Sequence, residues 1–246
     1  MERFIRERYA HRGLHGDGAA ENSLTAFRLA VEGGYGIELD IRLSRDGELV
    51  VFHDETLERV CGDPRRVVDL ELSELRSMHL SGTEDTVPTL REVLELVAGR
   101  VPLLIEIKLA PGESGVAEKF IEEIRDYGGD YIVESFNPMA LRYVRRSRGD
   151  ILIGILSAPY TRNKKFKGKA VYRQLERLRL NFLFRPDFIA YDKDGHDVTA
   201  LRVLRRLHRV PTVAWTVRSE DEEREARAHG FDTVIFEGYT PNDERK

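Results

Sequence analysis

Short apolar runs and longer amphipathic stretches alternate along most of the chain, and this alternation predicts its architecture. The apolar runs are typical of buried parallel strands, and the stretches between them carry apolar residues at helical spacing. We expect eight strands, which end near His11, Asp40, Lys108, Phe136, Leu156, Tyr191, Val217 and Glu237. Eight strands linked by helices predict the α/β fold class, as a single (β/α)8 TIM barrel domain spanning residues 1–246.

Some helix boundaries can be predicted from individual residues. Asn22 is expected to cap the first long helix, and Gly33 and Gly34 to end it. A later helix is predicted over 170–180, and Asn137 is expected to cap the helix that begins at Pro138.

The stretch 36–54 departs from the simple alternation of strand and helix. Its first half alternates strictly between apolar and polar residues, which predicts a strand with two unlike faces. Its second half returns as a strand rich in β-branched residues, so we expect a β-hairpin extension after strand 2. With the hairpin tip at Arg45 and Asp46, His53 comes close to Glu38.

Carboxylates gather at the ends of two neighbouring strands. Glu38 and Asp40 are two residues apart and so share one face of strand 2. Glu106 and Lys108 repeat this spacing at the end of strand 3. The first pair alone is equally compatible with a solvated sheet face, but a third carboxylate beside it favours a cation site. Carboxylate oxygens suit Mg²⁺ or Ca²⁺ better than Zn²⁺, so we expect one divalent cation of that kind.

Composition and charge exclude several classes of protein. The 246 residues include 39 Lys and Arg against 43 Asp and Glu, and a net charge of −4 argues against nucleic acid as a main partner. One cysteine excludes a disulfide framework within the chain. No stretch resembles a transmembrane span, and charged residues interrupt any signal-peptide core near the N-terminus. We therefore expect a cytoplasmic protein without stable membrane insertion.

An ordered set of short motifs resembles the glycerophosphodiester phosphodiesterase family. The motifs span nearly the whole chain and are His11-Arg12-Gly13, Glu21-Asn22, Glu38-Leu39-Asp40, Asp46-Gly47, His53-Asp54, Pro88-Thr89-Leu90, Glu106-Ile107-Lys108 and Trp215-Thr216-Val217. The resemblance implies a TIM barrel that hydrolyses a small-molecule glycerophosphodiester to glycerol 3-phosphate and an alcohol, with a divalent cation.

The resemblance also implies roles for single residues. His11 and His53 become the general acid and base, and Glu38, Asp40 and Glu106 become the cation ligands. This assignment agrees with the chemistry, because a phosphodiester resists nucleophiles until its charge is neutralised and its leaving group is protonated.

The expected substrate contacts come from three further residues. By resemblance, Arg12 and Lys108 hold the phosphate. Trp215 is assigned to the substrate pocket, where it lies beneath the glycerol or simply fills the barrel core. Near the C-terminus the family often has an acidic turn ending in Tyr-Pro, and the different sequence at 236–241 leaves the role of that loop open.

Two basic clusters lie outside this constellation. One is a loop that carries Arg162, Lys164, Lys165, Lys167 and Lys169; it is either a solvated loop or a device that steers anionic substrate. The other comprises Arg202, Arg205, Arg206 and Arg209, which we interpret as the solvated face of an outer helix.

Other functions remain compatible with the sequence. A lysophospholipase D-like or phospholipase C-like phosphodiesterase would need an apolar rim, of which the charged loops give little sign. A non-catalytic barrel that binds phosphorylated ligands would not need both histidines. The preferred alcohol group, the cation and the oligomeric state are not determined by the sequence.

Overall fold

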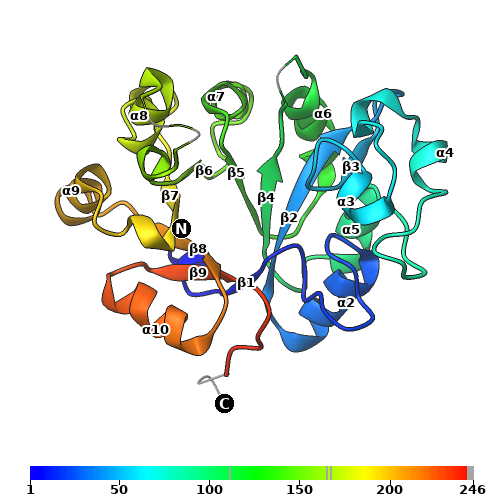
Figure 1. The fold of residues 1–246 in the computed structure, drawn as a ribbon, viewed down its shortest axis with the longest axis horizontal. Coiled ribbons are helices and arrows are strands. Elements are labelled where there is room, and N and C mark those ends of the chain that lie inside the picture. The colour runs from blue at the N-terminus through cyan, green and yellow to red at the C-terminus, as the bar shows by residue number, and fades with distance from the viewer. Residues whose placement is uncertain (111, 165, 167, 243–246) are drawn as a thin grey trace.

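Eight parallel strands close into a barrel in the computed structural model, which describes residues 1–110, 112–164, 166 and 168–242 (Figure 1). Closure occurs because β1 pairs with both β2 and β9, so the first and last strands of the barrel are neighbours. The predicted eight-stranded barrel is therefore confirmed. Its strands are β1 (Tyr9–Ala10), β2 (Gly36–Leu43), β4 (Leu103–Ile107), β5 (Tyr131–Ser135), β6 (Ile153–Ser157), β7 (Phe188–Asp192), β8 (Thr212–Val217) and β9 (Thr233–Phe236).

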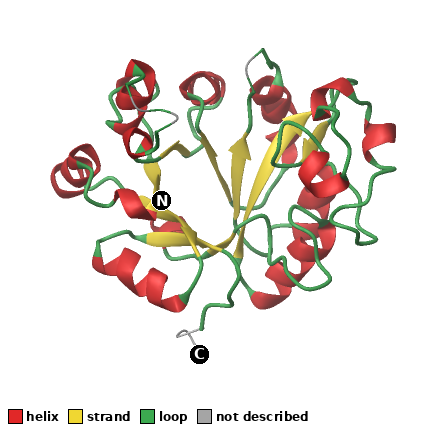
Figure 2. Ribbon diagram, in the orientation of Figure 1, coloured by secondary structure: helices red, strands yellow, loops and turns green. Residues whose placement is uncertain are grey.

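Helices surround the ring of strands (Figure 2). The long helices follow successive barrel strands, and all except α8 pack buried apolar residues against the outward-facing strand residues. They are α2 (Leu24–Gly33), α5 (Leu90–Val97), α6 (Val116–Glu123), α7 (Pro138–Ser147), α8 (Ala170–Glu176), α9 (Thr199–His208) and α10 (Glu220–Ala228). Three shorter helices are α1 (Glu2–Ile5), α3 (Glu58–Cys61) and α4 (Leu72–Leu75).

A ninth strand, β3 (Leu49–Val51), pairs antiparallel with β2 and forms the predicted hairpin. The two-residue tip that we expected at Arg45 and Asp46 is wrong by one residue. Leu43 pairs with Leu49, and the Ser44 backbone N–H donates to the Glu48 carbonyl, so the loop comprises three residues and ends at Gly47. Gly47 has a φ of 84°, the left-handed conformation that such a loop needs.

The segment between β3 and α5 forms an insertion with its own apolar cluster. Val50, Phe52, Leu57 and Leu75 belong to this cluster, which is separate from the cluster between the barrel and its helices. The insertion therefore covers one edge of the barrel mouth and carries the residues that follow β3, including His53.

Inside the barrel, an apolar floor lies below a polar upper layer. Leu104, Ile132 and Phe188 belong to the interior cluster. Side chains alternate along each strand, so Glu106 points to the same side as Leu104 and lies nearer the C-terminal end of β4. The polar upper layer is thus placed at the end of the barrel where active sites form in this fold.

Two helix predictions need correction. The N-cap of α2 is Ser23, whose side chain accepts a hydrogen bond from the Ala26 backbone, whereas Asn22 adopts a left-handed φ of 54°. The helix predicted over 170–180 ends at Glu176. The predicted cap of α7 is confirmed, because the Asn137 side chain accepts from the Met139 backbone.

Candidate active site

Three buried carboxylates converge at the mouth of the barrel. Glu38 and Asp40 come from β2 and Glu106 from β4, and each side chain offers an oxygen within 4.8 Å of the others. The register explains the proximity, because Asp40 pairs directly with Glu106 across the two parallel strands. All three residues are buried, with at most 5 % of their surface exposed. The structure therefore brings together the three carboxylates that the sequence analysis assigned to a cation.

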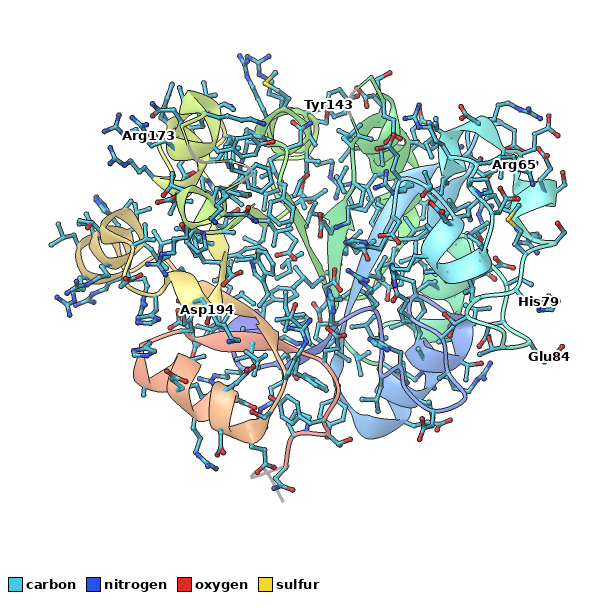
Figure 3. The ribbon with its side chains drawn as sticks, in the orientation of Figure 1. Arg65, His79, Glu84, Tyr143, Arg173 and Asp194 are labelled. Atoms are coloured by element: carbon cyan, nitrogen blue, oxygen red, sulfur yellow. The ribbon has the colours of Figure 1, made fainter. Side chains whose placement is uncertain are left out.

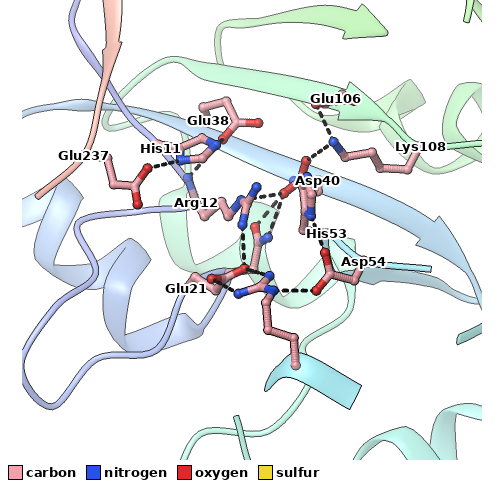
Figure 4. Close-up of polar contacts among 12 residues, drawn as sticks. His11, Arg12, Glu21, Glu38, Asp40, His53, Asp54, Glu106, Lys108 and Glu237 are labelled. Carbon is pink, nitrogen blue, oxygen red and sulfur yellow. Dashed lines mark hydrogen bonds and ion pairs between the residues drawn. The ribbon is translucent and has the colours of Figure 1, made fainter. Parts of the chain in front are cut away.

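Cationic and amide groups surround these carboxylates (Figure 4). The Lys108 Nζ lies 2.7 Å from the Glu106 carboxylate and 3.1 Å from that of Asp40. The Arg12 backbone N–H donates to Glu38 at 2.9 Å, and its guanidinium lies 3.4 Å from Asp40. The Asn22 side-chain amide donates to Asp40 at 2.9 Å.

This environment separates the acidities of the three carboxylic acids. Burial, reinforced by the neighbouring carboxylates, raises the pKa of Glu38 well above its ordinary value. Burial likewise raises the pKa of Glu106 to about 7, although Lys108 acts in the opposite direction. Burial would also raise the pKa of Asp40, but Lys108, His53 and Arg12 outweigh it and hold that pKa below its usual range.

The donor set fits a hard divalent cation. Two of the three carboxylates are difficult to ionise together, because each is buried next to the others and two cationic side chains compensate them only in part. Additional positive charge at the cluster would remove this penalty. Carboxylate oxygens are the ligands that Mg²⁺ and Ca²⁺ favour, so Glu38, Asp40 and Glu106 are suited to hold such an ion.

His11 is fixed beside the carboxylates by Glu237, the first residue after β9. The His11 Nδ1 lies 2.9 Å from the Glu237 carboxylate, and its Nε2 lies 4.0 Å from Glu38. The hydrogen bond from His11 lowers the pKa of Glu237 to about 2, so that carboxylate is ionised at neutral pH. It thereby favours the tautomer with the proton on Nδ1 and leaves Nε2 directed to the cluster.

His53 is held in a similar way on the insertion side. Its Nδ1 lies 2.7 Å from the Asp54 carboxylate, which also accepts from Arg59 of α3 at 2.6 Å. The Arg42 guanidinium donates to the His53 carbonyl at 3.0 and 2.9 Å. Burial lowers the pKa of His53 to about 4, so its Nε2 carries a lone pair at neutral pH.

Glu21 links the two halves of the site. Its carboxylate accepts from Arg12 at 2.7 Å and from both terminal nitrogens of Arg59 at 2.7 Å. Arg59 also holds Asp54, so Glu21 connects the loop after β1 to the partner of His53. Glu21 therefore supports the His11 loop through its contact with Arg12.

Several residues of the site escaped the sequence analysis. Asn22 contacts Asp40 instead of capping a helix, and neither Glu237 nor Asp54 was recognised as a partner of a histidine. His15 was also missed, and its ring offers a nitrogen within 4.8 Å of His11 and Glu237. Glu237 follows the last strand directly, and that position is the signal that could have revealed it.

Glu134 was also missed. It lies on β5 in register with Glu106, with 1 % of its surface exposed, and its Oε2 has no hydrogen-bond partner among the described residues. Burial, followed by the charges of Glu106 and Glu38, raises the pKa of Glu134 well above its ordinary value. Strict alternation along β5 would have placed this side chain inside the barrel.

Trp215 lies near the Lys108 side of the site. Its ring packs edge-to-face on Phe136, with centroids 5.6 Å apart, and the Lys108 Nζ is 5.9 Å from the Phe136 ring centroid. The Trp215 Nε1 is buried and has no hydrogen-bond partner among the described residues. Its contact with substrate stays a prediction.

The basic loop has a mixed outcome. Arg162 pairs with Asp197, so its charge is already compensated. Lys165 and Lys167 lie outside the described residues. Steering of substrate by this loop therefore stays a prediction.

The chain is similar to proteins of one family. It is 37 % identical over 159 residues to a glycerophosphodiester phosphodiesterase of Caldanaerobacter subterraneus, a match that covers 60 % of this chain and 65 % of that relative. The structure of a glycerophosphodiester phosphodiesterase from Thermotoga maritima superposes with a TM-score of 0.71 and 28 % identity, covering 93 % and 92 % of the two chains.

A third comparison concerns the fold. An Oleispira antarctica phosphodiesterase in complex with the product sn-glycerol-3-phosphate superposes with a TM-score of 0.80 at 24 % identity, covering 96 % of this chain and 94 % of the other. This likeness supports the shared barrel.

Among the described residues, no helix is both long enough and apolar enough to pass through a bilayer.

The family profile matches nearly the whole barrel. The profile of the glycerophosphoryl diester phosphodiesterase family matches residues 11–238, which run from the first to the last strand end of the site. The chain therefore belongs to the glycerophosphoryl diester phosphodiesterase family.

Proposed function

We propose that this protein hydrolyses glycerophosphodiesters to glycerol 3-phosphate and an alcohol, with one divalent cation, Mg²⁺ or Ca²⁺, and two histidines. The observation that carries the proposal is the convergence of three buried carboxylates with two histidines, each of which is bonded through Nδ1 to its own carboxylate. Membership of the family agrees with this activity.

The cation neutralises part of the phosphate charge when it is bound, which is the contribution that a divalent ion makes to phosphoryl chemistry. Glu38, Asp40 and Glu106 would hold it. The Arg12 guanidinium and the Lys108 ammonium group lie against the same carboxylates, where they can also bind the non-bridging oxygens of a phosphodiester.

The two histidines would move protons. Glu237 and Asp54 occupy the Nδ1 atoms of His11 and His53, so each ring offers Nε2 to substrate. One imidazole accepts the proton of the attacking hydroxyl, which belongs either to water or to the glycerol of the substrate. In the second case the product of the first step is a cyclic phosphate, which water then opens to glycerol 3-phosphate. The other imidazole protonates the departing alkoxide, and paired action of this kind is efficient near neutral pH.

Removal of the cation tests the proposal. With glycerophosphocholine as substrate, we expect turnover in the presence of Mg²⁺ or Ca²⁺ and loss of turnover in EDTA, measured as glycerol 3-phosphate released. Glu106→Gln should raise the cation concentration needed for half-maximal turnover, whereas Glu95→Gln, which changes an exposed acid on α5, should behave as the wild type. Equal rates with and without chelator would contradict the role of the cation.

A further inference from the structure

Charge is distributed unevenly along this chain. Residues 138–210 contain 18 Lys and Arg against 6 Asp and Glu, whereas the whole chain has a net charge of −4. The segment begins with α7 and ends just after α9, and these helices with α8 are neighbours along one side of the barrel (Figure 1). One side of the molecule is therefore cationic although the chain as a whole is acidic.

The same side displays large apolar residues to solvent. On α9, Leu207 is 74 % exposed and Val203 is 42 % exposed, while Leu201 on the opposite face is fully buried. Val203 and Leu207 are four residues apart and so lie on one helix face. Phe182, in the short 3-10 helix η4 (Asn181–Leu183) that follows α8, is 73 % exposed.

Arginines border these apolar residues. Arg202, Arg206 and Arg209 line a cavity of about 640 Å³ between α9 and α10, and none of the three pairs with a carboxylate in the described part of the chain. The acids of that cavity are already engaged, because Asp197 pairs with Arg162 and Asp232 accepts hydrogen bonds from Thr212. The lining of this cavity includes four arginines and two carboxylates, so the cavity carries a net positive charge.

Further arginines lie on the α8 side. Arg177 and Arg179 line a second cavity, between α8 and the start of α9. Arg173 projects from α8 away from the barrel (Figure 3). Arginines therefore line both of the cavities that border α9.

We propose that this cationic side docks on the surface of an anionic phospholipid bilayer. The docking surface comprises the α9 face, defined as Val203 and Leu207 with Arg202, Arg206 and Arg209, together with the exposed Phe182 of η4. Exposed apolar side chains next to unpaired cations are typical of elements that lie in the headgroup region. The apolar groups enter the headgroup boundary, and the guanidinium groups bind lipid phosphates through their parallel N–H donors.

The chemistry of the α9 face favours a bilayer over a nucleic acid. A nucleic-acid backbone would satisfy the arginines, but it gives no favourable environment to a leucine and a phenylalanine that are each about three-quarters exposed. None of these residues belongs to the active site, so docking does not require the proposed activity. Docking would hold the protein next to phospholipids without insertion of a helix.

Vesicle flotation tests the proposal. We expect the protein to float with phosphatidylcholine vesicles that contain about a third phosphatidylglycerol, much less with pure phosphatidylcholine, and less as salt rises. Each basic residue near such a surface raises the membrane partition coefficient about fivefold. A variant with Arg202→Gln, Arg206→Gln and Arg209→Gln should therefore lower the partition coefficient by at least tenfold.

A second variant separates the apolar contribution. Phe182→Gln with Leu207→Gln should weaken binding to the same vesicles even at high salt, where electrostatic attraction is screened. The matched control is Arg28→Gln with Leu29→Gln on α2, where both residues are exposed but lie outside the cationic side. This control should float as the wild type does.

Three results would overturn the proposal. They are no flotation with the anionic vesicles, an equal loss of flotation in the α2 control, or binding of duplex DNA under conditions where vesicles are not bound. Turnover of a soluble glycerophosphodiester should be unchanged in every variant. That readout shows that the variants are folded, and it separates failure of docking from failure of the proposed activity.

Discussion

The two histidines are the residues whose removal should affect chemistry most directly. His11→Ala and His53→Ala are each expected to lower kcat by roughly 100-fold or more, the scale of general acid-base catalysis. The decrease in kcat is measured from initial rates with glycerophosphocholine at saturating concentration. His79→Ala is the matched control, because His79 lies in the insertion and its ring Nδ1 is 2.9 Å from the carbonyl of Thr83, outside the candidate site. Wild-type turnover in either active-site variant would remove that histidine from the mechanism.

In the proposed mechanism, Glu237 acts by positioning His11. The Glu237→Gln substitution removes the charge that fixes the His11 tautomer, so we expect kcat to fall by about 10- to 100-fold, as for other residues that orient an active imidazole. KM should change little, because Glu237 does not contact the groups expected to bind phosphate. The pH dependence of kcat should shift in the variant, which a purely structural role would not produce. An unchanged pH profile would contradict this role.

At the scale of elements, a capping box fixes the residue at which α5 begins. Thr89 accepts from the Glu92 backbone, and the Glu92 side chain accepts from the Thr89 backbone, so both ends of a capping box are present. Thr89→Ala should lower the free energy of unfolding by about 1 kcal/mol, measured by urea denaturation. Thr199→Ala, at the exposed first residue of α9, is the control and should be nearly neutral. Equal effects of both substitutions would contradict the capping interpretation.

At the scale of the molecule, Glu223 joins three distant parts of the chain. Its carboxylate accepts from Arg8, which precedes β1, from Arg227 on α10, and from Tyr239, which follows β9. Burial would raise the pKa of Glu223, but the hydrogen bonds from the two arginines outweigh it and lower that pKa. The contacts therefore help to hold the first and last barrel strands together.

This linkage predicts a pH-dependent stability. A depressed pKa stabilises the fold above the unfolded pKa of about 4.3, and this contribution is lost as pH falls through the lower pKa of the folded state. Glu223→Gln should lower the free energy of unfolding by about 1–3 kcal/mol at neutral pH. The difference in Tm between wild type and variant should shrink as pH is lowered below about 4. A difference that is constant with pH would argue against an ionic role.

Much of this architecture could be predicted from periodicity. Eight apolar runs and the helices between them predicted the barrel. The spacing of Glu38, Asp40 and Glu106 predicted that these carboxylates lie on the inner surface of adjacent strands, and the register of β2 and β4 agrees. The reason is general, since parallel strands align residues of equal depth and alternation decides which of them face inward.

What escaped prediction depends on backbone conformations and contacts that alternation does not encode. The hairpin register shifted by one residue because Gly47 takes a left-handed conformation in a three-residue loop. Asn22 was mistaken for a cap because the same residue type also favours the left-handed conformation that turns its amide towards Asp40. Glu237 and His11 are 226 residues apart, and only closure of the barrel brings them together.

The position of His53 on the insertion has a consequence for heat inactivation. The barrel provides the three carboxylates, whereas the imidazole of His53 belongs to a segment with a separate, smaller apolar cluster. Smaller cooperative units open at lower free energy than the global transition. On warming, the insertion should unfold before the barrel. If His53 has the proposed role, turnover should be lost while the three carboxylates are still in place, and refolding of the insertion should restore it.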